Sequence, residues 1–349
     1  MKRRFDAVRH RPVRRVPAYE DHTAGSGTLT TPATEALDRA IRPLGASALD
    51  GDVPDAIWRR ALVGPAREFL SRPGKALRTT IVQAGWILGG GAPDAMPAGL
   101  PLVIEILHAG SLIVDDVEDG STERRGQATL HRLVGVPLAI NTGSWMYFWA
   151  LGELAQLGLP PEIELAAHRA AATTLVRCHQ GQALDLSTRV GNLAAHDVPA
   201  VVAATTRLKT GMLCRFAAEL GALAAGASAE TRARVAEIGE QTGIALQMLD
   251  DLGSLIAPAR RDKGREDLRD GRPTWPWAWL AERDPQTFDQ LVDVDDIDTV
   301  ADVLVAKIGE HGRGRICAAL DAVISAIGDG PATGKIVAEL RRMEKHYGC

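Results

Sequence analysis

Two clusters of carboxylates, each at the end of an apolar stretch, are the residues of this sequence best suited to chemistry. The first stretch reads IEILHAGSLIVDDVEDG and contains Asp115 and Asp119; the second reads GIALQMLDDLGS and contains Asp250 and Asp251. Two carboxylates about 6 Å apart repel by roughly 3 kcal/mol at an effective dielectric near 20, so the arrangement makes sense if cations lie between the clusters. Oxygen ligands at i, i+4 spacing, as in Asp115 and Asp119, suit Mg²⁺, which keeps waters and bridges to substrate phosphates.

Both acid clusters follow apolar residues at helical spacing, which predicts two helices that face a core and end near Gly120 and Gly253. Carboxylates at a helix C-terminus lie at the unfavourable end of the helix dipole, where each costs roughly 0.3–1 kcal/mol. This cost again indicates that the acids have a cation to bind.

The rest of the sequence also has a helical pattern. From about Thr31, Ala- and Leu-rich segments alternate with short Gly and Pro breakers, and 4% of the residues are aromatic. We therefore predict an all-α fold, a bundle with the long apolar helices inside, and a single domain over residues 31–349.

Residues 1–30 are rich in Arg, Pro, Gly and Thr. They are predicted to be a disordered basic arm, with weak attraction to an anionic membrane surface as the alternative. Substantial loops are expected at Gly120–Gly126, Ser187–Asp197 and Ala257–Pro276.

The overall composition excludes several classes of protein. With 349 residues, 46% hydrophobic and 24% charged, the chain can bury a large core. A formal net charge of −4 gives no support to a nucleic-acid partner, and no apolar run reaches the ~18 residues of a transmembrane segment. The first residues, MKRRFDAVRHRPVRR, are basic without an apolar core, so they do not form a secretory signal. Cysteines without ligand spacing indicate free thiols and a cytoplasmic location; they are Cys178, Cys214, Cys317 and Cys349.

Basic residues lie close to the first acid cluster, as a site for a metal and an anion requires. Arg124 and Arg125 follow Asp119 by one short turn. Beside carboxylates and Mg²⁺, guanidinium groups are good candidates for bidentate phosphate binding, and the alternative is a solvated charge pair at a loop tip. Upstream, Lys75 and Arg78 belong to the segment SRPGKALR, which is weak evidence alone because Pro–Gly turns with a nearby Lys are common.

Polar residues inside apolar helices are a second group of candidates. His108 precedes the first acid cluster by two helical turns, although a lone His on an apolar helix is more often a core residue. Lys209 and Thr210 interrupt one apolar helix, and Gln247 shares a helix face with Asp250. Buried polar groups must be paired or functional.

The order and spacing of these residues resemble the trans-isoprenyl diphosphate synthases of the polyprenyl synthetase family. The resemblance covers roughly Arg72 to Pro276. It includes the segments GKALR, DDVED, RRG, GQALD, KTG, QMLDD and DLRDGRPTWP, in this order. Within the family, HQGQALDL, INTGSWMYFWAL and DDVED are most similar to geranylgeranyl diphosphate synthases of the eukaryotic type.

The resemblance implies an isoprenoid-synthase helical bundle around a central cavity, and a homodimer. It also implies a reaction in which isopentenyl diphosphate condenses head-to-tail with an allylic diphosphate. The product would be a trans-prenyl diphosphate, with geranylgeranyl diphosphate as the expected chain length. The implied cofactor is Mg²⁺, with three ions in each active site.

The resemblance also implies roles for individual residues. The residues that would bind isopentenyl diphosphate are Lys75, Arg78, His108 and Arg125. Those that would hold Mg²⁺ against the allylic diphosphate are Asp115, Asp119 and Asp250. Those that would neutralise the allylic diphosphate further are Arg124, Lys209 and a basic residue near Lys263. Those that would place dipoles beside the developing allylic cation are Thr210 and Gln247.

Product length should depend on what blocks the growing chain along the helix that precedes Asp115. Gly110 and Ser111, which are five and four residues upstream, are too small to block it. We expect the stop to lie deeper, at aromatic residues such as Trp145 and Phe148, although ordinary core packing explains any one of them equally well. This favours a product longer than farnesyl diphosphate.

One position departs from the family pattern. The second acidic motif of the family reads DDxxD, whereas Ser254 takes the place of the last Asp here. If this position works through a metal-bound water, a Ser hydroxyl can still form a hydrogen bond with that water, so we interpret the change as tuning. The basic residue of the following motif is offset by one position, which leaves Arg261, Lys263 and Arg265 as candidates for one role.

Two other functions are compatible with these motifs. A terpene synthase of the same fold would ionise an allylic diphosphate without a second substrate, but it would have no use for Lys75, Arg78 and His108. A non-catalytic regulatory subunit would not be expected to keep an intact first acid cluster together with Arg124, Arg125 and Lys209.

Overall fold

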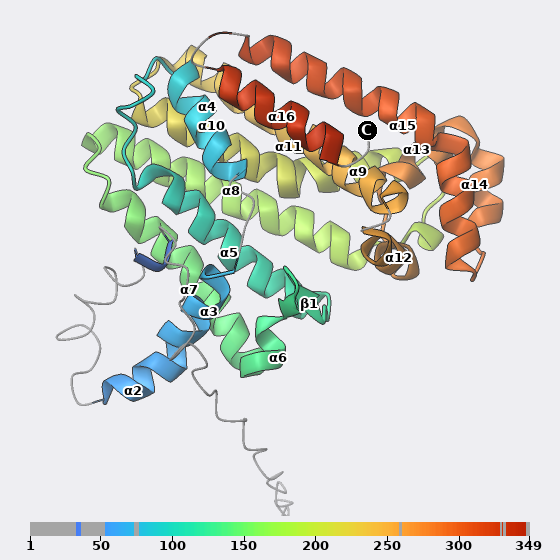
Figure 1. Cartoon of the computed structure of the whole chain (residues 1–349), viewed down its shortest axis with the longest axis horizontal. Helices are drawn as coiled ribbons and strands as arrows, with labels where there is room; N and C mark the ends of the chain where they lie inside the picture. Colours follow the sequence, from blue (N-terminus) through green and yellow to red (C-terminus); the bar gives the residue numbers. More distant parts are fainter. Residues whose placement is uncertain are drawn as a thin grey trace, which may run out of the picture. The chain divides into compact units, whose positions relative to one another are not determined.

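The structure is a computed structural model that describes residues 33–35, 53–72, 77–257, 260–328, 330 and 333–346. The predicted basic arm and Lys75 therefore lie outside the described residues. Within the described ranges the chain is almost entirely helical, with a single pair of two-residue strands, which confirms the predicted all-α fold class (Figure 1). Among the helices described, none combines the length and the apolar composition that a bilayer crossing needs.

The described residues form two compact units, and each is described by itself. The first contains residues up to 72 together with 109–146, and the second contains 77–108 and the residues from 147 onward. The division falls within α5 (Leu100–Glu118) and within α7 (Val136–Ala155). The single domain expected over residues 31–349 stays a prediction.

The first unit consists of short elements around the last turns of α5. They are α2 (Asp55–Trp58), the π-helix η1 (Arg59–Val63), α3 (Gly64–Leu70), β1 (Glu123–Arg124), β2 (Gln127–Ala128) and α6 (Leu130–Val134). The strands pair antiparallel, with Glu123 opposite Ala128 and Arg124 opposite Gln127. The expected loop Gly120–Gly126 is therefore irregular apart from β1, and it includes the turn of the hairpin.

The second unit is a helical bundle. Its elements are α4 (Leu77–Leu88), α8 (Pro161–Ser187), the 3₁₀-helix η2 (Val190–Asn192), α9 (Val198–Thr206), the π-helix η3 (Arg207–Gly211), α10 (Met212–Ala224), α11 (Ala229–Ile256), α12 (Arg261–Arg269), α13 (Trp275–Arg283), α14 (Pro285–Leu291), α15 (Ile297–Ile327) and α16 (Gly334–His346). Helix α10 packs against α4 and α11, and α11 packs against α15 (Figure 1). Apolar side chains such as Leu252, Trp279 and Leu304 form its largest core.

Glycines allow α4 and α10 to approach with their backbones in contact. A Cβ atom on Gly85 would lie 2.0 Å from the carbonyl oxygen of Ala218, and one on Gly221 would lie 2.3 Å from that of Val82. Neither position has room for a side chain, so this crossing fixes how closely the two helices pack.

The two acidic helices end differently. Helix α5 stops at Glu118, and Gly120 follows with φ +65°, which confirms the predicted end. The predicted end at Gly253 is wrong, because α11 continues to Ile256. Leu255 and Ile256 pack against the apolar core of this unit, and that packing extends the helix past the glycine. Asp250 and Asp251 consequently lie within a helix rather than at its end.

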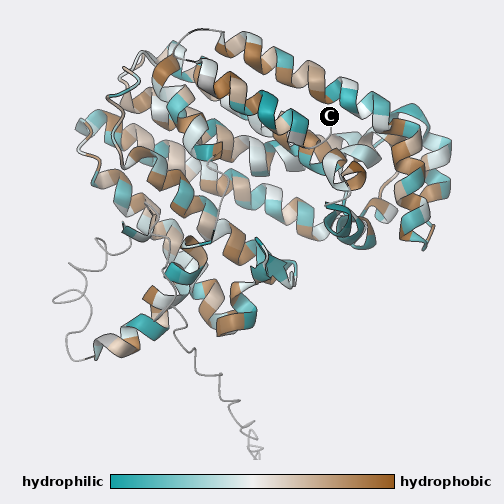
Figure 2. Ribbon diagram, viewed as in Figure 1, coloured by the Kyte–Doolittle hydropathy of each residue, from teal (hydrophilic) through white to brown (hydrophobic). Residues whose placement is uncertain are grey.

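Of the two remaining predicted loops, one is confirmed and the other is wrong. Residues 187–197 form a loop apart from the helical Ser187 and the short η2, as expected. Ala257–Pro276 is not a loop, because it contains α12 and the first residues of α13. Helix α12 is one of the most hydrophilic segments of the chain (Figure 2). The helix was not predicted because its sequence is highly charged and it buries little more than Gly264 and Leu268.

The glycine contact between α4 and α10 gives the first prediction. Gly85→Ala should lower the free energy of unfolding by about 1–3 kcal/mol, because the new methyl group forces the two backbones apart. The matched control is Gly314→Ala in α15, where the site is open and alanine should be neutral or stabilise the helix by up to about 1 kcal/mol. Urea unfolding followed by circular dichroism measures both. Equal stability of the two variants would contradict the prediction.

Candidate active site

The first acid cluster is paired with a cation inside its own unit. Asp116 is fully buried, and Arg124 Nε donates to its Oδ1 at 2.7 Å. Arg124 Nη2 also lies 3.4 Å from Asp115 Oδ2. Burial raises the pKa of Asp116 against the opposing effect of Arg124. Burial alone would lower the pKa of Arg124, but its bonds to Asp116 and the nearby acids raise it, so the guanidinium stays charged.

The carboxylates at the end of α5 are suitable ligands for magnesium. Asp115 and Asp119 offer oxygen ligands at i, i+4 spacing, and the buried Oδ2 of Asp116 has no hydrogen-bond partner among the described residues. No three His, Cys, Asp or Glu side chains in the described part of the chain are already gathered for a metal. Because Mg²⁺ is usually held by one or two carboxylates plus substrate phosphates and waters, such a preformed cluster is not required.

Lys209 and Thr210 lie in the π-helix η3, a rare element that often marks functional sites. Lys209 Nζ donates to Asp185 Oδ2 at 2.5 Å, and Arg272 Nη1 donates to the same oxygen at 3.3 Å. Asp185 on α8 thus holds two cations together. The sequence marked Asp185 as part of a motif but gave it no role, because its two partners are 24 and 87 residues away.

Two glycines make room for η3 between its neighbouring helices. A Cβ atom on Gly181 of α8 would lie 2.9 Å from the backbone nitrogen of Lys209, and one on Gly243 of α11 would lie 2.7 Å from the carbonyl oxygen of Thr210. Only glycine allows α8 and α11 to approach the π-helix η3 this closely, which explains why residue 181 of the HQGQALD segment is glycine. Cys178 Sγ also contacts the Lys209 carbonyl oxygen at 3.6 Å.

A chain of hydrogen bonds joins Thr210 to the second acid cluster. Thr210 Oγ1 donates to Gln247 Oε1 at 2.8 Å, and Gln247 Nε2 donates to Asp251 Oδ1 at 2.7 Å. The backbone nitrogen of Trp275, at the start of α13, donates to Asp251 Oδ2 at 3.0 Å. Asp251 therefore fixes which way the Gln247 amide points. Sequence reasoning named Asp251 only as a motif residue.

Asp250 is paired with two cations at the start of α12. Arg260 Nη2 donates to Asp250 Oδ1 at 2.6 Å, and Lys263 Nζ donates to Oδ2. Burial would raise the pKa of Asp250, but Lys263 and Arg260 lower it below its usual value. Of the three basic candidates in this segment, Lys263 is the one beside Asp250. Arg265 pairs instead with Asp298 at 2.6 Å, and Arg260 was missed because the sequence did not reveal α12.

Ser254 is buried beneath α12. Its hydroxyl donates to the Asp250 carbonyl oxygen at 2.7 Å, and a Cβ atom on Gly264 would lie 2.4 Å from the Ser254 carbonyl oxygen. The hydroxyl hydrogen is thus committed to the helix backbone, so the side chain can only accept a hydrogen bond from a bound water. The structure also gives Ser254 a packing role, at a close contact of α11 with α12.

Arg78 and His108, which were predicted to bind isopentenyl diphosphate, both belong to the second unit. Burial lowers the pKa of Arg78, and Cys214 and Glu105 oppose the shift. Its buried Nε has no hydrogen-bond partner among the described residues. An unsatisfied guanidinium nitrogen in the interior is suited to an anionic ligand. His108 is half-buried on α5.

The residues predicted to control product length have different environments. Gly110 is buried against α7, where a Cβ atom on Gly143 would lie 2.9 Å from its carbonyl oxygen. Ser111 and Trp145 are half-buried. The Phe148 side chain is 72% exposed, so in a single chain it does not line a cavity. The role of all four residues stays a prediction.

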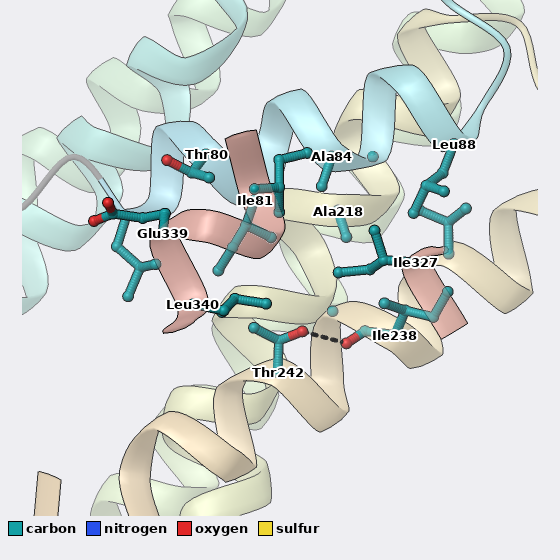
Figure 3. Close-up of a pocket in the computed structure, with 15 residues that line it drawn as sticks. Thr80, Ile81, Ala84, Leu88, Ala218, Ile238, Thr242, Ile327, Glu339 and Leu340 are labelled. Carbon is teal, nitrogen blue, oxygen red and sulfur yellow. Dashed lines mark hydrogen bonds between the residues drawn. The ribbon is translucent and has the colours of Figure 1, made fainter. Parts of the chain in front are cut away.

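A small apolar pocket lies elsewhere in the second unit (Figure 3). It is enclosed by α4, α10, α11, α15 and α16, with Ile81, Ala84 and Leu340 among its lining residues. The Thr242 hydroxyl beside it donates to the Ile238 carbonyl oxygen at 2.7 Å. None of the predicted site residues lines this pocket, so it is a packing gap and not the candidate site.

Known proteins share both sequence and fold with this chain. The family model for polyprenyl synthetase matches residues 59–306. Geranylgeranyl pyrophosphate synthase 2 of Zymoseptoria tritici is 30% identical over 244 residues, which cover 69% of this chain and 68% of that protein. Geranylfarnesyl diphosphate synthase of Aeropyrum pernix is 33% identical over 220 residues, or 61% of this chain and 68% of that protein.

Solved structures extend the comparison to nearly the whole chain. Geranylgeranyl pyrophosphate synthetase from Pyrococcus horikoshii superposes with a TM-score of 0.72 at 22% identity, covering 90% of this chain and 98% of that one. Geranylgeranyl pyrophosphate synthase from Corynebacterium glutamicum, complexed with isoprenyl diphosphate and magnesium, gives a TM-score of 0.71 at 22% identity, with coverages of 90% and 96%. At these identities the likeness shows a common fold.

The buried Asp251 gives a prediction about pH. Burial raises its pKa from 3.8 to about 7, against the opposing effect of its hydrogen bonds. The folded state therefore binds the proton more tightly than the unfolded state, so the contribution of Asp251 to stability is full below about pH 4 and is lost as the pH rises to about 7. In metal-free protein, Asp251→Asn should remove this loss, which is on the order of a few kcal/mol.

Urea unfolding in the presence of a chelator, across this pH range, measures the effect. Asp289→Asn, at an exposed acid on α14, is the matched control and should keep the pH profile of the natural protein. If Asp251→Asn also gave a parallel profile, Asp251 would not titrate as its burial indicates.

Proposed function

Because the chain belongs to the polyprenyl synthetase family, we propose that it condenses isopentenyl diphosphate with an allylic diphosphate, head to tail, to make a trans-prenyl diphosphate. The expected product is geranylgeranyl diphosphate, the chain length named for several relatives of 29–32% identity. The observation that carries the proposal is the pairing of both acid clusters with cations, Asp116 with Arg124 and Asp250 with Lys263. Such neighbouring carboxylates and cations suit a metal diphosphate, because the carboxylates can bind the metal ions and the cations can bind the diphosphate.

The proposed reaction begins with cleavage of the allylic C–O bond, whose electron pair leaves with the diphosphate. The residues that would hold Mg²⁺, with three ions expected, are Asp115, Asp119 and Asp250, and the bound metal would supply positive charge for that leaving group. Arg124 and Lys209 add fixed positive charge around it. Groups aimed at charge as it develops lower the barrier most in a site that excludes water.

The remaining allylic cation is stabilised by dipoles of the protein. Thr210 gives its hydroxyl hydrogen to Gln247, which leaves the lone pairs of the Thr210 oxygen available to the cation. The alkene of isopentenyl diphosphate then forms the new C–C bond, and loss of a proton restores a double bond. No side-chain base stands out among the predicted site residues, so we assign that proton to the released diphosphate.

Isopentenyl diphosphate is assigned to Lys75, Arg78, His108 and Arg125. Arg78 provides the strongest support, because its buried nitrogen lacks a partner in the described residues. Holding the two substrates in line supplies much of the remaining rate enhancement through orientation.

We also propose that the chain acts as a homodimer. Apolar side chains on α7 and α8 are open to solvent in a single chain: Phe148, Leu165 and Val176. A second copy that covered them would remove this apolar surface from water. Light scattering during size-exclusion chromatography measures the mass.

Cytoplasmic location also stays a prediction, which rests on the free cysteines.

The third prediction tests the reaction and the first acid cluster. Purified protein with Mg²⁺, farnesyl diphosphate and labelled isopentenyl diphosphate should yield a labelled, longer diphosphate. Asp115→Ala should lower turnover by at least about a hundredfold, because a charge-stabilising group is lost, and should leave the helical circular dichroism intact. Asp94→Ala, at an exposed acid before α5, is the matched control and should keep full activity.

Other outcomes of the same assay point to other functions. A cyclised hydrocarbon without label would indicate a terpene synthase, and no turnover at all would indicate a regulatory subunit. Full activity of Asp115→Ala would show that this cluster does not hold the metal.

The fourth prediction concerns product length. Trp145→Ala or Phe148→Ala should lengthen the product, because one of these aromatic rings is expected to stop the growing chain. Leu133→Ala, at an exposed apolar residue on α6, is the control and should leave the product unchanged. Mass spectrometry of the dephosphorylated products measures the distribution. An unchanged distribution in both aromatic variants would contradict the prediction.

A further inference from the structure

We propose that Arg72 is a positioning residue that holds the hairpin carrying Arg124 and Arg125 in its working conformation. Within the described residues the Arg72 side chain hydrogen-bonds to Glu68 and to two hairpin carbonyls, and not to the acids at the end of α5. It acts on the backbone of the hairpin, and through it on the two arginines. The inference rests on the proposed function only in that Arg124 and Arg125 are taken to bind diphosphate.

The hairpin has little to stabilise it on its own. Each strand is two residues long, and residues 122, 123 and 126–128 are exposed. An isolated two-stranded hairpin is marginal in water at best. Contacts with the rest of the first unit must therefore decide whether it keeps its shape.

The turn of the hairpin adds a conformational cost. Arg125 and Gly126 both have positive φ, at 57° and 77°, the signature of a type I′ turn. Glycine adopts this region freely. Arg125 is the one non-glycine residue with positive φ in the described part of the chain, and this conformation costs it roughly 1–2 kcal/mol. The conformation persists only if neighbouring groups enforce it.

The Arg72 guanidinium joins the two strands on either side of this turn. Its Nη1 donates to the Arg124 carbonyl oxygen at 3.1 Å, and its Nη2 donates to the Ala128 carbonyl oxygen at 2.7 Å. These carbonyls belong to β1 and β2, respectively. One planar group with several fixed donors therefore holds both strands at a set separation.

Arg72 is itself fixed by α3. Its side chain is almost fully buried, and it donates to both carboxylate oxygens of Glu68, at 2.8 and 3.0 Å from Nη2. The guanidinium lies over the ring of the buried Phe69, 5.2 Å from the centroid. Arg125 lies over the same ring at 5.7 Å, and its Nη1 donates to the Arg72 carbonyl oxygen at 3.4 Å. The turn is thus held at its tip as well as at its strands.

These contacts leave Arg124 fixed at both ends. Its carbonyl oxygen is bound by Arg72, and its guanidinium is bound by Asp116 and Asp115. A hairpin released from Arg72 would let the Arg124 side chain shift relative to the acid cluster. A displacement of about 1 Å at such a site can lower the rate a hundredfold.

The fifth prediction uses limited proteolysis of the folded protein with trypsin, which cleaves after Arg and Lys. Arg72→Lys keeps the charge but loses the planar, multiply donating group, and Pro73 protects the bond after residue 72 from trypsin in both proteins. Cleavage after Arg124 and Arg125 should become about tenfold faster or more, because it follows the population of the open hairpin. Arg132→Lys, at an exposed arginine on α6, is the matched control and should leave hairpin cleavage unchanged.

A second variant tests the clamp without changing Arg72. Glu68→Gln keeps the shape of the side chain but weakens the anchor of the Arg72 guanidinium, so hairpin cleavage should again accelerate, by a smaller factor. In both variants KM for the diphosphate substrates should rise, and kcat/KM should fall by about tenfold for Arg72→Lys. A merely destabilised protein would lose active molecules and lower kcat at unchanged KM.

Unchanged cleavage of the hairpin in folded Arg72→Lys would overturn the proposal. So would faster cleavage with unchanged kinetics, since Arg72 would then hold the hairpin without serving the reaction. Arg124→Lys and Arg125→Lys separate this inference from the proposed function. If these variants kept full kcat/KM while Arg72→Lys released the hairpin and lost activity, the diphosphate-binding role of the two arginines would fail and the clamp would stand.

Discussion

A carboxylate that is removed from water must be matched by positive charge or by hydrogen bonds, or it takes up a proton, and this requirement shapes the candidate site. Asp116 is matched by Arg124, Asp185 by Lys209 and Arg272, and Asp250 by two cations next to α12. Breaking such pairs leaves a buried charge without compensation, which is far more costly than losing an exposed pair. The acids and the basic residues therefore hold each other in place.

Close backbone contacts place these charges accurately. The π-helix η3 lies between α8 and α11 because Gly181 and Gly243 leave space for it, and α12 rests on α11 through Gly264. Lys209, Asp250 and Lys263 therefore lie on segments whose separation is set by direct contact between backbones. Side chains that lie on rigid elements can be held to the tolerance that catalysis needs.

The sequence predicted the helical fold and the two acid clusters, because apolar periodicity and residue spacing are local properties. It also placed Arg124 beside the first cluster, since only a short turn separates them. It could not predict that α12 is a helix, because this segment is too charged to show a pattern. Nor could it assign Asp185 or Arg72, whose partners lie far away in the chain and meet them only in the folded unit.

The pairing of Asp250 with Arg260 and Lys263 has a thermodynamic consequence. In the free protein the two cations occupy the Asp250 carboxylate and leave one positive charge in excess, so a lone divalent cation finds no open carboxylate there. An anion that attracts the two basic side chains leaves the carboxylate exposed to a cation, and each ligand then strengthens the other. Because such coupling is reciprocal, the factor by which the metal tightens anion binding equals the factor by which the anion tightens metal binding.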